Sequence, residues 1–152
     1  MTHNLHYSIA FLIIRVVFGF RLIYGTLDNV TDWERMMEFK LFLETNGFPL
    51  PLVCAIVSVY LQFIAGISWI IGYQVKITSI LMILNFLVAI LGYHLVHGDD
   101  YLTTAPAIHL LSISIALLLC GPGKLSLDKK WRKQEFVRLD LQIVSLAFRF
   151  VT

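Results

Sequence analysis

The stretch from residue 51 to residue 73 contains no charged side chain, and this feature constrains the fold more than any other. At about 1.5 Å of rise per residue, a helix of this length crosses a hydrocarbon layer roughly 30 Å thick. Ser58, Gln62 and Gly66 recur within it every four residues and therefore share one helix face. Small and polar residues on a membrane helix favour contact with other helices. The sequence thus predicts a membrane-spanning helix that packs inside a helical bundle.

Three further apolar segments are candidate membrane spans, the last of them somewhat short, so four spans are predicted in all. They cover residues 5–27, 51–73, 77–96 and 106–120. Apolar residues make up 58% of the chain and the net charge is only +2, which gives no basis for nucleic-acid binding. The sequence predicts an all-α fold, an integral membrane four-helix bundle formed by residues 1–123 and followed by a basic tail at residues 124–152.

Basic residues near the ends of the spans fall mostly on one side of the membrane, with Arg35 and Lys40 on the other. Because positively charged flanks stay in the cytoplasm, both termini are predicted there, in a bacterial cytoplasmic membrane. The tail begins with a basic amphipathic segment that suits anionic lipid headgroups. Its candidate lipid-binding residues are Lys129, Lys130, Arg132 and Lys133. Residues 139–152 are predicted either to lie in the membrane interface or to dock on another chain.

The loop between the first two spans is predicted to contain a short helix. Thr31 and Glu34 match a T-x-x-E capping box, and Gly47 ends the segment. Its apolar residues cover a wide arc, as in a helix that lies in the membrane interface. This helix would be either a lid or a plain cover for the apolar rim of the bundle. In the fourth span, Thr104 is predicted to cap the helix and Pro106 to lie in its first turn.

Two arginines, Arg15 and Arg21, lie inside the first predicted span, where a charge needs a partner. All ten Asp and Glu residues fall outside the interiors of the spans, so we expect no carboxylate at the depth of Arg15. In one interpretation Gln62, Ser58 and backbone carbonyls solvate Arg15, while Arg21 extends to the headgroups. In the other, the anion comes from outside the chain, as a lipid phosphate, a cofactor, a reduced quinone or an acid on a partner subunit.

Three histidines are predicted near the outer ends of the third and fourth spans. His94, His97 and His109 would suit a metal, a haem or a proton-accepting quinone site, or else ordinary hydrogen bonding at the interface. Asn85, in the middle of the third span, is a further candidate for ligand or partner contact and for hydrogen bonding between helices. Cys54 and Cys120 fall near opposite membrane faces and are predicted to be free, mostly buried thiols.

Several separated elements form one pattern. They are Arg15-x-x-x-Gly19 followed by Gly25, GFPLP at 47–51, Gln62 with Gly66 and Gly72, and GPGKLSLD at 121–128. The pattern resembles the DoxX family of four-helix membrane proteins over roughly residues 10–130, and GPGKLSLD is its most specific part. The resemblance implies a bundle with both termini inside and a relation to the membrane subunit of thiosulfate:quinone oxidoreductase. The family commonly has a lysine and a glutamate where this chain has Asp28 and Gln62, so the resemblance is to a divergent member.

Two functions follow as hypotheses. In the first, the chain takes part in a membrane redox or respiratory process, and Arg15, Gln62 and the outer histidines line a pocket for a quinone, a lipid or another cofactor such as haem. It would then be a subunit of a quinone-linked oxidoreductase. In the alternative, it is a non-catalytic accessory subunit of a larger membrane complex and docks through its intramembrane arginines and its tail. Its partners would be lipids and either other membrane subunits or further copies of the same chain.

Overall fold

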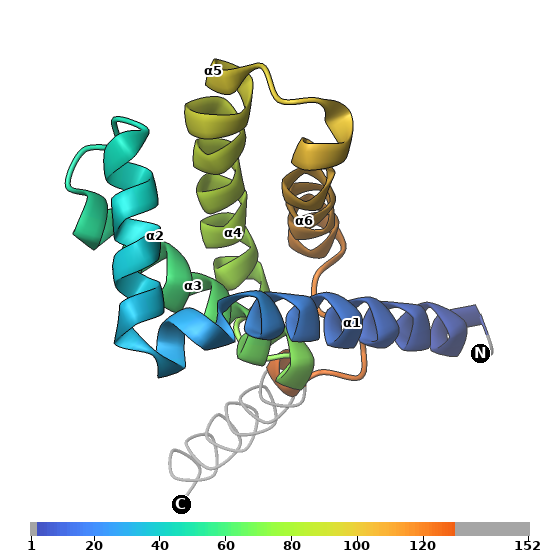
Figure 1. Ribbon diagram of the computed structural model, residues 1–152. Helices are drawn as coiled ribbons and strands as arrows, with labels where there is room; N and C mark the ends of the chain where they lie inside the picture. Colours follow the sequence, from blue (N-terminus) through green and yellow to red (C-terminus); the bar gives the residue numbers. More distant parts are fainter. Residues whose placement is uncertain (1–2, 130–152) are drawn as a thin grey trace, which may run out of the picture.

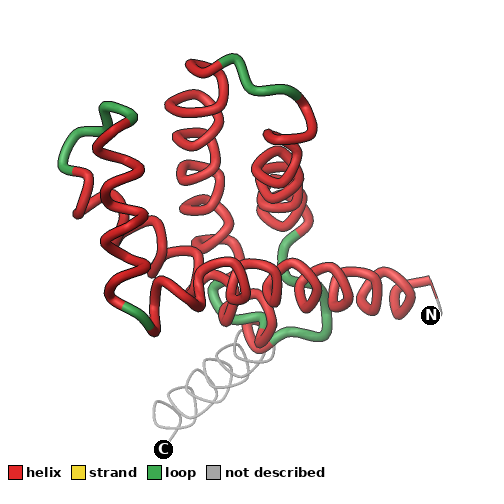
Figure 2. The backbone as a smooth tube through the Cα atoms, in the orientation of Figure 1, coloured by secondary structure: helices red, strands yellow, loops and turns green. Residues whose placement is uncertain are grey.

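The computed structural model describes residues 3–129, and this part of the chain contains helices and loops but no strand (Figure 2). Its elements are α1 (His3–Thr31), α2 (Trp33–Thr45), α3 (Pro51–Ile71), α4 (Val75–Ala89), the π-helix η1 (Ile90–His94), α5 (Leu95–His97) and α6 (Tyr101–Cys120). Within the described range, four helical segments are long and apolar enough to cross a membrane. The predicted all-α four-helix membrane fold is therefore confirmed. Lys130, Arg132, Lys133 and residues 139–152 lie outside the described residues.

The four spanning segments share one apolar core. α3 packs against both α1 and α4, and α4 packs against α6 (Figure 1). Leu22 of α1, Trp69 of α3, Met82 of α4 and Leu110 of α6 are buried together in this core. At most 7% of each of these side chains is exposed. The sequence therefore folds into a bundle in which every span contributes to one interior.

Two glycines allow α1 and α3 to cross with their backbones in contact. A Cβ atom on Gly19 would lie 2.7 Å from the carbonyl oxygen of Gly66, and a Cβ atom on Gly66 would lie 2.6 Å from that of Gly19. Both distances are shorter than carbon and oxygen tolerate without a bond, so neither position admits a side chain. Close approach through small residues is a common way for membrane helices to associate. The polar and small face predicted for residues 51–73 thus meets another helix at Gly66.

The ends of two helices differ from the sequence prediction. α2 forms in the predicted loop, but its N-cap is Asp32, whose side chain accepts the Glu34 amide hydrogen bond at 2.9 Å. Thr31 instead ends α1, where its hydroxyl donates to the Leu27 carbonyl. The capping box prediction was wrong because α1 continues beyond residue 27 and takes Thr31 into its last turn.

α6 begins earlier than the predicted residue 106. Asp100 is its N-cap and accepts hydrogen bonds from the backbone amide and hydroxyl of Thr103, at 3.0 and 2.6 Å. Thr104 and Pro106 therefore lie within the helix, and the predicted roles for both were wrong. The acidic cap precedes the apolar segment from which the span was predicted. A prediction based on hydropathy alone therefore made the fourth span too short.

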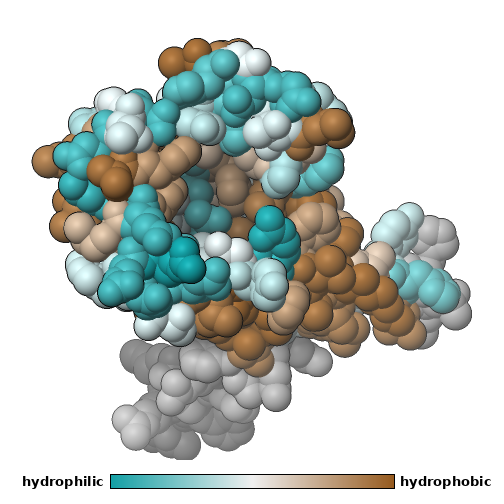
Figure 3. All heavy atoms as spheres, in the orientation of Figure 1, coloured by the Kyte–Doolittle hydropathy of each residue, from teal (hydrophilic) through white to brown (hydrophobic). Residues whose placement is uncertain are grey.

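Apolar side chains remain exposed along the outside of the spans, as in a protein that faces lipid. On α1, exposed residues include Ile13, Val17 and Phe20. Figure 3 shows hydrophobic residues along α1, whereas hydrophilic residues gather over α2 and the connection between α5 and α6. With the four spanning segments, this surface identifies an integral membrane protein. Cys54 and Cys120 are both free, as predicted, but Cys120 is exposed rather than buried.

Candidate functional site

The bundle has two ends with different contents. We call the end that carries α2, η1 and α5 the α2 end. The opposite end carries the turn between α3 and α4, and residues 121–129 fold against that turn, so we call it the turn end. Each end holds part of the residue set that the sequence singled out.

A pocket of about 510 Å³ lies between α3 and α4 at the α2 end. Most of its wall is apolar, and its polar lining comes from Ser58 on α3 and from Asn85, Tyr93 and His94 on α4 and η1. Three phenylalanines complete it, Phe39, Phe42 and Phe48, and we call it the aromatic pocket. An apolar cavity with a few convergent polar groups is typical of a small-molecule site.

α2 covers this pocket because two of its side chains anchor it to α3. Met36 and Leu43 are buried against Ala55 and Val59. Phe39 and Phe42 are then placed over the space between α3 and α4. The predicted interfacial helix thus contributes directly to a cavity wall, which is consistent with the lid interpretation.

Aromatic contacts join this cover to η1. The ring centroids of Phe42 and Tyr93 are 4.8 Å apart. Phe48 lies against Gly92, where an added Cβ would come within 3.2 Å of its ring. These aromatic residues could not be recognised from the sequence, because a phenylalanine in a predicted interfacial helix carries no signal that distinguishes a pocket wall from a membrane contact.

The third span changes its helical hydrogen bonding at the pocket. In η1 the Leu95 amide donates to the Ile90 carbonyl, five residues back, instead of four as in an α-helix. Such π-turns insert one extra residue and are frequent at functional sites. Tyr93 and His94 belong to this turn and also line the pocket. The turn therefore sets the direction of two of the polar lining residues.

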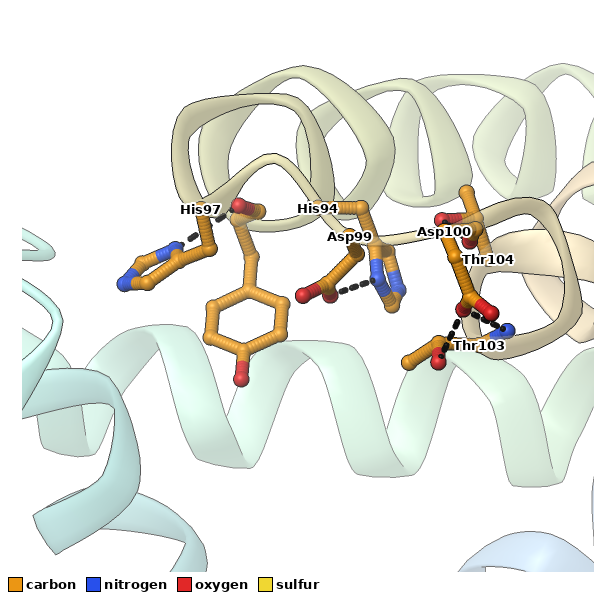
Figure 4. A network of polar contacts seen from close by, with 7 residues as sticks. His94, His97, Asp99, Asp100, Thr103 and Thr104 are labelled. Atoms are coloured by element: carbon orange, nitrogen blue, oxygen red, sulfur yellow. Dashed lines mark hydrogen bonds and ion pairs between the residues drawn. The ribbon is translucent and has the colours of Figure 1, made fainter.

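The predicted outer histidines do not form one cluster. His94 Nδ1 lies 2.8 Å from Asp99 Oδ2, and His97 Nδ1 lies 2.8 Å from the Tyr93 carbonyl oxygen (Figure 4). His109 is exposed on α6. Between residues 3 and 129, no three His, Cys, Asp or Glu side chains are arranged to hold a metal ion. Of the three histidines, His94 alone lines the aromatic pocket.

The loop beside these histidines also holds the cap of α6, Asp100. The two hydrogen bonds from Thr103 lower the pKa of the Asp100 carboxyl below its ordinary value, because they favour the charged form. This side chain is therefore a charged cap at neutral pH. Figure 4 shows it beside Thr103, separate from the contact between His94 and Asp99.

Ser58 and Gln62 bond to each other rather than to Arg15. The Gln62 amide donates to the Ser58 hydroxyl at 3.1 Å. Ser58 lines the aromatic pocket with Asn85, but Gln62 and Arg15 do not. The hypothesis of one pocket lined by Arg15, Gln62 and the histidines was wrong in this respect, because Arg15 points to the other end of the bundle.

Arg15 is buried at the turn end, with 1% of the residue exposed. Its guanidinium donates to the Leu125 carbonyl oxygen at 2.5 Å, a contact between residues 110 positions apart. Nε and Nη1 make no hydrogen bond with the described residues. The guanidinium also lies against Gly72, where a Cβ would come within 2.0 Å of Nη1. A backbone carbonyl solvates Arg15, as one interpretation held, but it comes from the segment after α6.

Asp128 explains why this segment folds back. Its carboxylate accepts hydrogen bonds from the amides of Gln74 and Val75 at 2.7 and 3.1 Å, and its own amide donates to the Gly72 carbonyl at 2.9 Å. It thereby caps the N-terminus of α4. Asp128 also attracts Arg15 electrostatically. The sequence placed no carboxylate at the depth of Arg15, but an acid beyond the last span returns to the bundle and acts on Arg15 from the turn end.

Arg21 differs from Arg15 in its exposure and in its contacts. It is exposed on α1, and its side chain extends along the helix to Gly25, where a Cβ would lie 2.6 Å from Nη1. No ion pair of Arg21 is found among the described residues. This direction, towards the C-terminal end of α1, agrees with the interpretation in which Arg21 extends to the headgroups.

Comparison with known proteins agrees with this architecture. The chain is 24% identical to Inner membrane protein YphA of Escherichia coli (strain K12) over 129 residues, which cover 80% of this chain and 85% of the relative. No solved structure matches the chain. The family model of DoxX matches residues 10–97, a region that includes Arg15 and the aromatic pocket and ends before Gly121. Because this match covers more than half of the sequence, the chain belongs to the DoxX family.

Proposed function

We propose that this DoxX-family membrane protein binds a small hydrophobic molecule with a polar head in the aromatic pocket, and that the ligand is a quinone of a membrane redox process. The observation that carries the proposal is the lining, which combines apolar and aromatic walls with Ser58, Asn85, Tyr93 and His94. A quinone ring stacks on aromatic side chains, and its oxygens accept hydrogen bonds from hydroxyl and amide donors. A lipid is the other ligand that such a lining would accept.

His94 would have a particular role in this site. Its Nδ1 is engaged with Asp99, so Nε2 remains as the ring nitrogen for other contacts. A carboxylate partner fixes the orientation of an imidazole ring and leaves its other nitrogen directed at a ligand. Quinone redox chemistry exchanges protons together with electrons, and His94 would hold the proton. The electron donor or acceptor would be a further protein, which would make this chain a subunit of a quinone-linked oxidoreductase.

The membrane and the orientation are also part of the proposal. The relative is named an inner membrane protein, so we assign this chain to a bacterial inner membrane. Lys76, Lys124 and Lys129 all line one cavity at the turn end, and the N-terminal turns of α1 border the same cavity. The positive-inside rule then puts the turn end and both termini in the cytoplasm.

The alternative is an accessory subunit that docks on a larger membrane complex. Arg15 supports it less than the sequence suggested, because this side chain is buried within its own chain. Arg21 supports it more, since an exposed arginine within a span would pair with an acid on a neighbouring subunit. Stoichiometric co-purifying proteins that are lost from an Arg21→Leu variant would favour this alternative over the quinone site.

The quinone proposal is tested by purifying the chain in mild detergent and measuring bound quinone by extraction and mass spectrometry. Val88 lines the pocket and is 58% exposed, so Val88→Trp should narrow the pocket without disturbing the core. We expect quinone retention to fall about tenfold, and Asn85→Leu to lower it several-fold through a lost hydrogen bond.

Val17→Trp is the matched control, because Val17 is 54% exposed on α1 and lies outside the pocket. It should leave retention unchanged. If all three variants retain as much quinone as the parent chain, the pocket is not the site. If lipid but no quinone is recovered, and Val88→Trp displaces it, the ligand is a lipid and the redox role fails.

A further inference from the structure

A second cavity, of about 390 Å³, lies at the turn end of the bundle. Its walls come from three distant parts of the sequence: the N-terminal turns of α1, the start of α4 and the segment that follows α6. Three lysines line it, Lys76, Lys124 and Lys129, and none of its lining residues is an Asp or Glu. We call it the lysine cavity. It is separate from the aromatic pocket and shares no lining residue with it.

Two glycines with positive φ angles bring the lysines together. Gly121 and Gly123 have φ angles of 73° and 77°, which favour glycine, and they turn the chain back after α6. A Cβ on Gly123 would lie 3.4 Å from Phe11 Cβ, and one on Gly121 would lie 3.4 Å from Lys76 Cε. The turn therefore rests on α1 and on the Lys76 side chain, and Lys124 follows it directly.

Within the part of the chain that the structure describes, no ion pair neutralises the positive charge of the cavity. The nearby carboxylate of Asp128 is occupied by the amides of Gln74 and Val75 and does not line the cavity. Three exposed lysines around one cavity make its electrostatic potential positive, which favours an anion there. The cavity thus has the charge distribution of an anion site.

Two features favour an anion attached to an apolar group. Phe11 and Pro122 are among the wall residues, so the cavity is partly apolar. It also lies where α6 leaves the bundle, at the level at which lipid headgroups meet a spanning helix. We propose that the lysine cavity binds the phosphate group of an anionic phospholipid, with the acyl chains beside the exposed apolar residues of α1, such as Ile9 and Ile13.

Cys120 makes this binding measurable in the full chain. It is exposed and lines the lysine cavity, whereas Cys54 lines the aromatic pocket. The protein in a neutral detergent is treated with a maleimide, and alkylation of each cysteine is followed by peptide mass spectrometry. Phosphatidylglycerol should slow alkylation of Cys120 about fivefold or more, whereas alkylation of Cys54 reports separately on lipid in the aromatic pocket. Phosphatidylcholine at the same concentration should not protect Cys120.

Three outcomes would overturn the proposal. Equal protection by phosphatidylcholine would mean non-specific lipid coverage. Protection by millimolar inorganic phosphate alone would identify a soluble phosphate, and not a lipid, as the occupant. No protection by any of them would mean that the cavity binds no phosphate group.

Charge variants connect the protection to the lysines. Lys76→Gln combined with Lys124→Gln should abolish most of the protection, because each substitution removes one positive charge that attracts the anionic headgroup. Lys40→Gln removes one positive charge from α2, where Lys40 pairs with Glu44, and should not change the protection. Lys76→Arg should retain it.

If the double variant does not fold, the same attraction is tested on the unmodified chain. Raising the salt from about 0.15 M to 0.5 M shortens the range of electrostatic attraction and should reduce protection by phosphatidylglycerol. Protection that survives both the double substitution and high salt would contradict an electrostatic site.

Discussion

The two ends of the bundle are closed by different kinds of contact. At the turn end, Asp128 accepts two backbone hydrogen bonds from the start of α4, and buried Arg15 donates to the Leu125 carbonyl. At the α2 end, the cover is α2, which is held on α3 by the apolar side chains of Met36 and Leu43. Hydrogen bonds fix direction as well as distance, whereas apolar contacts allow sliding and separation. We therefore predict that the turn end is the more rigid of the two and that α2 separates from the bundle more easily.

The largest expected effect on stability comes from filling the space that the Arg15 guanidinium occupies at the turn end. In Gly72→Ala the new Cβ would lie 2.0 Å from Arg15 Nη1 and 2.7 Å from Ser126 Cβ, at a residue whose φ angle is 73°. We expect the free energy of unfolding to fall by about 3 kcal/mol or more, through strain and a displaced buried charge. Thermal unfolding in detergent measures it.

Gly98→Ala is the matched control for that substitution. Gly98 also has a positive φ angle, 65°, but a Cβ there has no neighbour within 4 Å. Only backbone strain remains, which costs about 1 kcal/mol. If both variants lose the same stability, the contact between Arg15 and Gly72 does not hold the turn end together.

The next effect concerns the α2 end. Met36 lies on the face of α2 that is buried against α3, so Met36→Ala should weaken the docking of α2 on α3 by about 2 kcal/mol. We expect faster hydrogen exchange in α2, with α3 and α4 unchanged. Met37→Ala is the control, because Met37 is 38% exposed and should change little. Faster exchange throughout the chain would show that α2 is part of the global fold and not a separable cover.

A smaller effect is expected at the cap of α4. Asp128→Ala removes the acceptor of two backbone amides at the turn end, and such a loss costs about 1 to 2 kcal/mol. Exchange of the Gln74 and Val75 amides should accelerate, and the segment 121–128 should become more accessible to protease. Asp32→Ala removes the exposed cap of α2, which accepts one amide hydrogen bond, and should lower the free energy of unfolding less. An Asp128→Ala variant as stable as the parent would contradict the role of this residue as a long-range cap.

How much of this was predictable from the sequence depends on the range of the contacts. The uncharged segment 51–73 predicted a spanning helix correctly, because the length and polarity of a span are properties of consecutive residues. Asp128 was not predicted as a cap of α4, since local capping rules apply only to neighbours in sequence. It caps α4 from 54 residues away. The sequence likewise placed no carboxylate at the depth of Arg15, because the acid that acts on it is distant in sequence.

The pocket shows a related limit. Ser58 and Asn85 were recognised as polar residues within spans, and the structure brings them into one lining. Gln62 was placed with Arg15, but a side chain one helical turn away, Ser58, accepts its hydrogen bond. The phenylalanines that complete the pocket had no polar signal at all. Polarity in the sequence therefore pointed to two of the residues that line the pocket, whereas the cavity shape depended on how α2 folds over α3.

The smallest effect tests whether the α2 end has an electrostatic element comparable with Asp128. Hydrogen bonds from Thr103 lower the pKa of Asp100 in the folded chain. Their stabilisation is therefore present above the unfolded pKa of about 3.9 and is lost as the pH falls through the lower folded-state pKa. Asp100→Asn keeps a neutral cap and removes this titration. We expect the melting temperature of the variant to fall less between about pH 5 and pH 3 than that of the parent, by a small margin because Asp100 is exposed. Thr103→Val removes the hydroxyl hydrogen bond to Asp100 and should also make the melting temperature depend less on pH. If the melting temperatures of both variants change with pH as much as that of the parent, the Asp100 cap is not an electrostatic element of the α2 end.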